Sequence, residues 1–114
     1  RNPNNQTLSK KGERMKVQSI EDILVPLQEK KQFLHDSFGV LKIGIFGSFT
    51  KGNQTVSSDI DIIVELDKGK KTLHNFLALK RLLENEFERS VDLGFEHTLK
   101  SAVRNKIKKE ITYV

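Results

Sequence analysis

The stretch Gly44–Leu66, GIFGSFTKGNQTVSSDIDIIVEL, contains two apolar segments separated by a polar, turn-rich segment, and the fold prediction starts from it. It begins as an apolar segment and breaks at Gly47 and Ser48. Ten residues later it resumes as a second apolar segment that carries Asp59 and Asp61. Short runs of Ile, Val and Phe bounded by turn residues predict two buried strands, one on each side of the break. Two like charges in such a strand need an explanation, because neighbouring carboxylates repel each other.

The elements around these two strands follow from hydrophobic spacing. The strands themselves cover residues 40–46 and 60–66, and further β-prone segments cover 90–95 and 111–114. Helices are predicted from Ser19 to Gly39 with either a kink or a late helix start at Pro26, from Thr72 to Phe87, and from Leu99 to Ile107. The order helix, strand, strand, helix, strand, helix predicts an α+β fold, a small mixed β-sheet with helices packed on one face.

Composition limits the classes of protein to consider. The 114 residues are enough for one domain, and the absence of cysteine excludes disulfides and thiolate metal sites. The chain shows neither an apolar run long enough to cross a membrane nor a secretory signal, so we expect a cytoplasmic protein. The net charge of +5 comes mainly from residues 1–16, which hold five basic residues and one acidic residue. The remainder is nearly neutral, so binding to nucleic acid is not expected.

The first residues differ in composition from the rest of the chain. Residues 1–14, RNPNNQTLSKKGER, are polar and lack periodicity, which is typical of a disordered leader. The chain opens on Arg1, and its one methionine is Met15, so we expect that the natural protein starts at Met15. Residues 1–16 are therefore predicted to be a leader that is not native, and residues 17–114 to be the folded domain.

The two aspartates of the quoted stretch predict a metal site. Side chains two residues apart on a strand point to the same face, so Asp59 and Asp61 lie together while the isoleucine between them faces the core. Asp92 in the third strand stands opposite its own apolar neighbours. If the two strands pair, three carboxylates converge. Such oxygen ligands suit Mg²⁺ or Mn²⁺, and two ions held this way catalyse phosphoryl or nucleotidyl transfer. The Asp-x-Asp pair alone is more typical of a solvated strand end, and the metal-site prediction depends on Gly47, Ser48 and Asp92 in addition.

The break between the strands predicts a phosphate-binding corner. Gly47 lets the backbone approach a ligand, the Ser48 hydroxyl can donate to a phosphate oxygen, and Lys51 adds positive charge. An ordinary strand-exit turn is the alternative. A P-loop is excluded, because Asn53 and Gln54 stand where lysine and serine or threonine are required.

Gly-Ser, ten residues, Asp-x-Asp and a later strand acid together resemble the DNA polymerase beta-type nucleotidyltransferase superfamily. Within it, the short chain resembles the minimal nucleotidyltransferases that are paired with HEPN-domain proteins. The resemblance implies that Gly47 and Ser48 hold the nucleotide phosphates and that Asp59 and Asp61 bind both metal ions. It also implies that Asp92 completes one metal site and helps to deprotonate the acceptor hydroxyl.

The resemblance carries an expected function. It implies a nucleotidyltransferase that uses ATP and two Mg²⁺ ions, with Mn²⁺ as a substitute, and moves AMP to a hydroxyl, most plausibly a tyrosine, of a HEPN-type toxin. The chain would then be the antitoxin. Lys51 departs from the arginine that the family often has near this position. The chain is too short for an acceptor domain, so a partner protein or a homodimer would close the metal face. Two alternatives remain open: an antitoxin that occludes its partner without catalysis, and a small-molecule nucleotidyltransferase.

Overall fold

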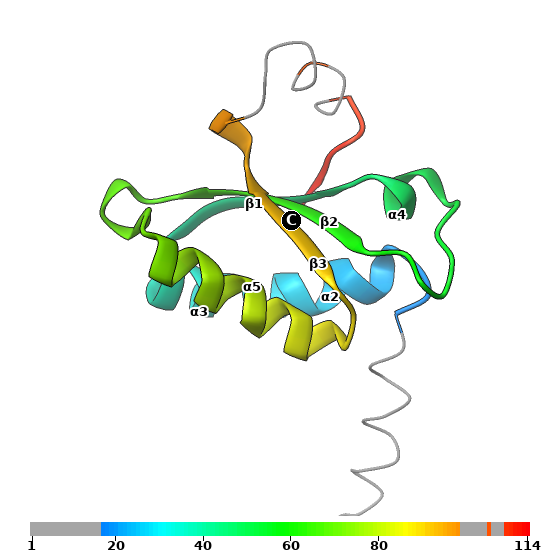
Figure 1. The fold of residues 1–114 in the computed structure, drawn as a ribbon, viewed down its shortest axis with the longest axis horizontal. Helices are drawn as coiled ribbons and strands as arrows, with labels where there is room; N and C mark the ends of the chain where they lie inside the picture. The colour runs from blue at the N-terminus through cyan, green and yellow to red at the C-terminus, as the bar shows by residue number, and fades with distance from the viewer. Residues whose placement is uncertain (1–16, 99–104, 106–108) are drawn as a thin grey trace, which may run out of the picture.

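A four-stranded sheet forms the centre of the computed structural model, which describes residues 17–98, 105 and 109–114 (Figure 1). The strand order is β3-β2-β1-β4. β1 (Val40–Phe46) pairs antiparallel with both β2 (Ile60–Leu66) and β4 (Thr112–Tyr113), whereas β2 pairs parallel with β3 (Val91–Phe95). The predicted α+β fold with a mixed sheet is confirmed, and β1 and β2 have the predicted bounds.

Three helices cover one face of this sheet (Figure 1). They are α2 (Glu21–Glu29), α3 (Lys31–Phe38) and α5 (Leu73–Phe87). A fourth helix, α4 (Ser48–Lys51), is a single turn that follows β1, and two short 3₁₀ turns, η1 (Lys68–Lys70) and η2 (Glu96–Thr98), flank the longer elements. No described helix is both long and apolar enough to cross a membrane.

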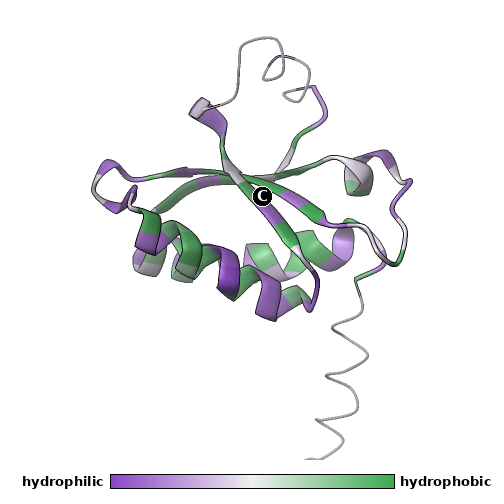
Figure 2. Cartoon of the chain, in the orientation of Figure 1, coloured by the Kyte–Doolittle hydropathy of each residue, from purple (hydrophilic) through white to green (hydrophobic). Residues whose placement is uncertain are grey.

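The core lies between the sheet and the three helices. Figure 2 shows hydrophobic residues along the strands and polar residues on the outer sides of the helices. On the sheet side, Ile45, Ile60 and Ile62 are fully buried. The helices contribute Ile23, Leu27, Leu34, Leu79, Leu83 and Phe87. Each such side chain stabilises the fold by about 1.5–3 kcal/mol through removal of apolar surface from water.

The observed ends of α3 and α5 include two boundaries that were predicted from the sequence. Gly39, in the left-handed conformation with φ of 70°, ends α3 as predicted. Thr72 begins α5, because its hydroxyl accepts the Asn75 N–H at 3.1 Å. The predicted third helix and the leader lie largely outside the described residues.

The late helix start predicted at Pro26 is wrong, because α2 begins at Glu21. Pro26 lies inside α2, and the helix divides at Lys30, where φ and ψ are −98° and 6°. The carbonyl of Pro26 still accepts the Lys30 N–H at 3.0 Å, so the proline removes one donor without ending the helix. Ser19 does not cap α2 with its side chain, but the Asp22 carboxylate accepts the Ser19 N–H at 3.1 Å, the second half of the predicted capping box.

Candidate active site

Two of the predicted site acids stand side by side on neighbouring strands. Asp61 of β2 is the register partner of Asp92 in the parallel β3, and neighbouring strands lie about 4.8 Å apart. Asp59 lies just before β2, with the fully buried Ile60 between it and Asp61. Because side chains alternate along a strand, the acids lie on the face opposite the core. The strand pairing on which convergence of the three acids depended is therefore present.

Repulsion within this group affects the ionisation of Asp61. Burial raises the pKa of the Asp61 carboxyl above its ordinary value, and the negative charges of Asp92 and Asp59 raise that pKa further. In the described parts of the chain, no lysine, arginine or histidine forms an ion pair with any of the three acids. The local electrostatics favour binding of a cation.

The oxygen ligands of the three acids fit a hard divalent ion. The three acids offer only oxygen ligands, as Mg²⁺ and Mn²⁺ prefer. Among the described residues, no three acidic, histidine or cysteine side chains are already arranged to hold a metal ion. Asp59 and Asp92 both line a hollow of about 390 Å³ at the edge of the sheet.

Gly47 places the backbone directly against Asp61. Its φ and ψ of 81° and −147° belong to a region that is essentially restricted to glycine. A Cβ atom at this position would overlap the Asp61 carboxylate oxygen Oδ2. Glycine is therefore required for two independent reasons, backbone conformation and close approach.

The corner after Gly47 is fixed by its own hydrogen bonds. The Gly47 carbonyl accepts the N–H groups of Thr50 at 3.1 Å and Lys51 at 3.2 Å, and also the Thr50 hydroxyl at 2.8 Å. Ser48 is the first residue of α4, where backbone N–H groups have no partner within the helix. The half-buried Ser48 thus presents an amide and a hydroxyl as donors beside the acids.

Two neighbours of this corner differ in their surroundings. Phe49 is 2 % exposed and belongs to the core, which supports a packing role over contact with a nucleotide base. Lys51, predicted near the phosphates, has its ammonium Nζ 3.6 Å from Glu110 Oε1. A phosphate at the corner would compete with Glu110 for this lysine.

Arg89, which contacts the loop leading to Asp59, was not predicted as a functional residue. Its guanidinium donates to the carbonyls of Thr55 at 3.0 Å, Ser58 at 2.8 Å and Val17 at 2.6 Å. The residue types around Arg89 form no recognised motif, so only the tertiary structure identifies these contacts.

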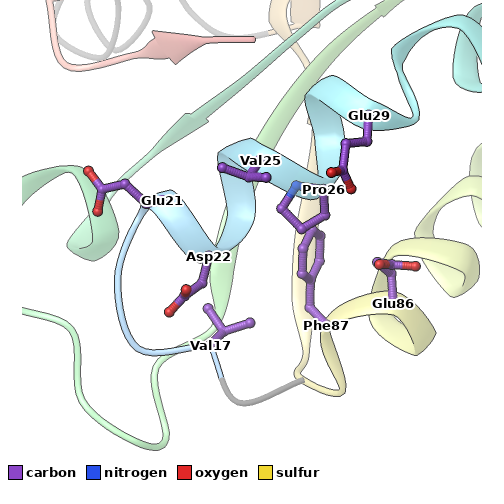
Figure 3. Close-up of a pocket in the computed structure, with 8 residues that line it drawn as sticks. All are labelled: Val17, Glu21, Asp22, Val25, Pro26, Glu29, Glu86 and Phe87. Atoms are coloured by element: carbon purple, nitrogen blue, oxygen red, sulfur yellow. The ribbon is translucent and has the colours of Figure 1, made fainter. Parts of the chain in front are cut away.

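Another hollow of about 390 Å³ lies between α2 and the end of α5 (Figure 3). Its lining combines apolar side chains with four carboxylates: Val17, Glu21, Asp22, Val25, Pro26, Glu29, Glu86 and Phe87. None of the predicted site residues lines it. Two of its carboxylates have partners within the fold: Glu86 lies 3.6 Å from Lys30, and Asp22 accepts the Ser19 N–H at 3.1 Å.

Comparison with known proteins decides the family, because residues 27–114 match the model of the nucleotidyltransferase domain. The chain belongs to the nucleotidyltransferase family. It is 34% identical over 100 residues to the protein adenylyltransferase MntA of Thermococcus cleftensis, covering 88% of this chain and 100% of that protein. These findings confirm that the chain is a nucleotidyltransferase.

Solved structures share the fold of this nucleotidyltransferase. One, assigned as a minimal nucleotidyltransferase, has a TM-score of 0.68 and 27% identity, and the match covers 80% of this chain and 92% of that one. Two toxin–antitoxin structures have TM-scores of 0.57: an MntA–HepT complex at 18% identity and a complex with AMP-PNP at 23%. The matches cover 79% and 75% of this chain, and 69% of each of those chains. At these identities the likeness establishes the fold alone.

Proposed function

We propose that this nucleotidyltransferase transfers AMP from ATP to a hydroxyl of a partner toxin and thereby acts as its antitoxin. The observation that carries the proposal is the pairing of Asp61 with Asp92 across parallel strands, directly against the glycine corner at Gly47. The adenylyltransferase name of the relative from Thermococcus cleftensis supports AMP as the transferred group. Residues 17–114 would form the catalytic domain.

Each site residue has a role that its position supports. The amide and hydroxyl of Ser48 would donate to phosphate oxygens that approach over Gly47. Asp59, Asp61 and Asp92 would hold two divalent ions, Mg²⁺ or Mn²⁺. Bound divalent ions supply Lewis-acid stabilisation of the charge that develops on the phosphate oxygens. Lys51 would leave Glu110 for the phosphates.

The transfer forms one bond and breaks one. The oxygen of the acceptor hydroxyl bonds to the α-phosphorus of ATP, and the bond from that phosphorus to the α–β bridging oxygen breaks. Pyrophosphate leaves with the electron pair of the broken bond. Asp92, which is exposed on the edge strand β3, takes the proton of the hydroxyl.

The partner would supply the acceptor hydroxyl. The MntA–HepT complex provides the precedent for a toxin partner in this fold, and we infer that the partner here is a HEPN-type toxin with an acceptor tyrosine. The proteins would act together in the cytoplasm, with a homodimer as the other way to close the metal face.

Two observations favour a second function, occlusion of the partner without catalysis. No three described side chains form a metal site as they stand, and Lys51 is paired with Glu110. A stable complex without covalent change would then be the means of neutralisation.

Intact-mass spectrometry distinguishes the two functions. The protein is mixed with ATP, Mg²⁺ and the product of the neighbouring gene, and the partner is weighed. Catalysis predicts a partner heavier by one AMP, a gain that Asp59→Asn and Asp61→Asn abolish. Asp36→Asn, an exposed acid on α3, is the matched control and should retain the gain. A partner that is tightly bound but unmodified would contradict catalysis and support occlusion.

A further inference from the structure

Arg89 joins three segments that are far apart in the sequence. It lies in the turn between α5 and β3, and its guanidinium donates to carbonyls in the loop 53–59 and at Val17. The guanidinium carbon also stands 5.3 Å from the centre of the Phe49 ring in α4. One side chain therefore contacts both the loop before β2 and the helix that begins at Ser48.

The loop is folded so that two of its carbonyls reach the same guanidinium nitrogen. The Thr55 N–H donates to the Ser58 hydroxyl at 2.8 Å, and the Ser58 N–H donates to the Thr55 carbonyl at 3.1 Å. This turn brings the carbonyls of Thr55 and Ser58 together, and Arg89 Nη1 donates to both. The loop conformation thus depends on a donor supplied from outside it.

Asp59 is held on both sides by consecutive residues of the α5–β3 turn. The carbonyl of Ser58 before it accepts from Arg89 at 2.8 Å. The N–H of Ile60 after it donates to the Ser90 carbonyl at 2.9 Å. Asp59 lies outside β2 and has no ladder pairing of its own, so these two bonds fix its place relative to Asp92, which follows Ser90 by two residues.

The contacts require the shape of arginine as well as its charge. Three carbonyls and one aromatic face surround the group, and within the described residues Arg89 has no carboxylate partner. A planar guanidinium can donate along fixed directions and stack on a ring at once, whereas an ammonium cannot reproduce that geometry.

We propose that Arg89 is a positioning residue of the transferase, which fixes the loop carrying Asp59 against the strand carrying Asp92. The proposal rests on the proposed function for its catalytic consequence, while the loop contacts stand independently. Small displacements of catalytic groups reduce rates strongly, so loss of the clamp should lower kcat by about 10–10²-fold.

The test compares Arg89→Lys with two controls in the full chain. Arg81→Lys makes the same replacement at an exposed position of α5, and Val40→Ala removes core contacts at the opposite end of the sheet. Five quantities are measured: melting temperature, amide exchange of residues 55–60, Kd for Mn²⁺ by electron paramagnetic resonance, and kcat and KM for ATP in transfer to the partner. Arg89→Ala, which also loses the stacking on Phe49, serves as the stronger variant if it folds.

The expected result for Arg89→Lys is about tenfold faster exchange at residues 55–60, about tenfold weaker Mn²⁺ binding, and a kcat that falls more than KM changes. Arg81→Lys should match the wild type, and Val40→Ala should lose stability while keeping Mn²⁺ affinity and kcat. Wild-type values for Arg89→Lys, or equal losses in an equally destabilised Val40→Ala, would overturn the proposal.

Failure of the proposed function has a different signature. A wild type that neither binds Mn²⁺ nor transfers AMP overturns that function, whatever Arg89 does. The exchange comparison between Arg89→Lys and Arg81→Lys still applies in that case, and equal exchange at residues 55–60 would overturn the clamp itself.

Discussion

The two ends of β2 carry acids on the same face of the sheet but in opposite electrostatic surroundings. Asp61 lies near the start of the strand, and its pKa is raised by burial and by the negative charges of Asp92 and Asp59. Glu65 lies four residues on, where Lys71 stands 3.1 Å away and His97 3.5 Å away. Burial acts to raise the pKa of Glu65 as well, but the bonds and charges of these two partners outweigh it, and the pKa is lowered.

The difference separates acids that are ion-paired within the fold from acids that we propose to bind metal ions. At the paired end, defined as Glu65, Lys71, His97 and their neighbours Lys42, Glu96 and Tyr113, charges are matched within the fold. At the open end, defined as Asp59, Asp61 and Asp92, no described lysine, arginine or histidine forms an ion pair with an acid. An arrangement that destabilises the folded chain is informative, since functional sites are where such arrangements persist.

The largest expected effect is on catalysis at the open end. If Asp61 holds the metal ions as proposed, Asp61→Asn should lower transfer of AMP by at least about 10²-fold, because a bound ion contributes several kcal/mol of transition-state stabilisation. Glu65→Gln should remain within a few-fold of the wild type. Both rates are measured by partner mass gain over time. Equal losses in the two variants would remove the functional distinction between the ends.

The second effect concerns the close approach of Gly47 to Asp61. Gly47→Ala should destabilise the fold and lower activity by about 10²-fold, because the new methyl displaces the carboxylate. Gly52→Ala is the control, because Gly52 also has a positive φ, 75°, but a methyl group added there meets open space. This control should cost only the conformational strain of about 1–2 kcal/mol. Chemical denaturation and the transfer assay measure the two quantities, and an active Gly47→Ala would contradict the site geometry.

Metal-free stability should change in opposite directions at the two ends. The raised pKa of Asp61 means that the folded state holds its proton more tightly than the unfolded state, so stability falls as pH rises from the ordinary value of 3.8 through the folded pKa. The lowered pKa of Glu65 gives stability that is present above 4.5 and lost as pH falls through the folded pKa.

At pH 7 in EDTA, Asp61→Asn should therefore raise Tm by a few degrees, and Glu65→Gln should lower it by a similar amount. Mg²⁺ with ATP should raise the Tm of the wild type and of Glu65→Gln but leave that of Asp61→Asn nearly unchanged. Differential scanning fluorimetry measures each shift. A lower Tm for metal-free Asp61→Asn would show that the aspartate stabilises the fold.

The smallest effect lies at the paired end and can be read spectroscopically. Burial, the hydrogen bond to Glu96 at 2.7 Å and the charge of Glu96 raise the pKa of Tyr113 to about 12. The chain has one tyrosine and no tryptophan, so ultraviolet absorbance titrates Tyr113 alone. The midpoint should lie near 12 in the wild type and move toward 10 in Glu96→Gln. An unchanged midpoint in that variant would exclude Glu96 as a cause.

Local sequence predicted most of the elements because their signals are local. Runs of apolar residues predicted both ends of β1 and of β2. Gly39 predicted the end of α3, and Thr72 predicted the N-terminal cap of α5. The division at Lys30 was missed, because the proline gave the stronger signal and the helix tolerated it. The spacing of Asp59, Asp61 and Gly47 likewise pointed to the site from local pattern and family resemblance.

The sequence by itself determined which residues face the core and which acids share a face, because alternation along a strand follows from backbone geometry. Only the tertiary structure decided that β3 lies parallel beside β2 with Asp92 opposite Asp61, that Glu65 is paired, and that Arg89 holds the loop before Asp59. Asp61 and Asp92, like Ser58 and Arg89, are separated by about 30 positions in the sequence. Glu65 and Lys71 are closer in sequence but lie on either side of the turn that contains η1. No local pattern encodes such contacts, because they depend on how the whole chain packs around one core.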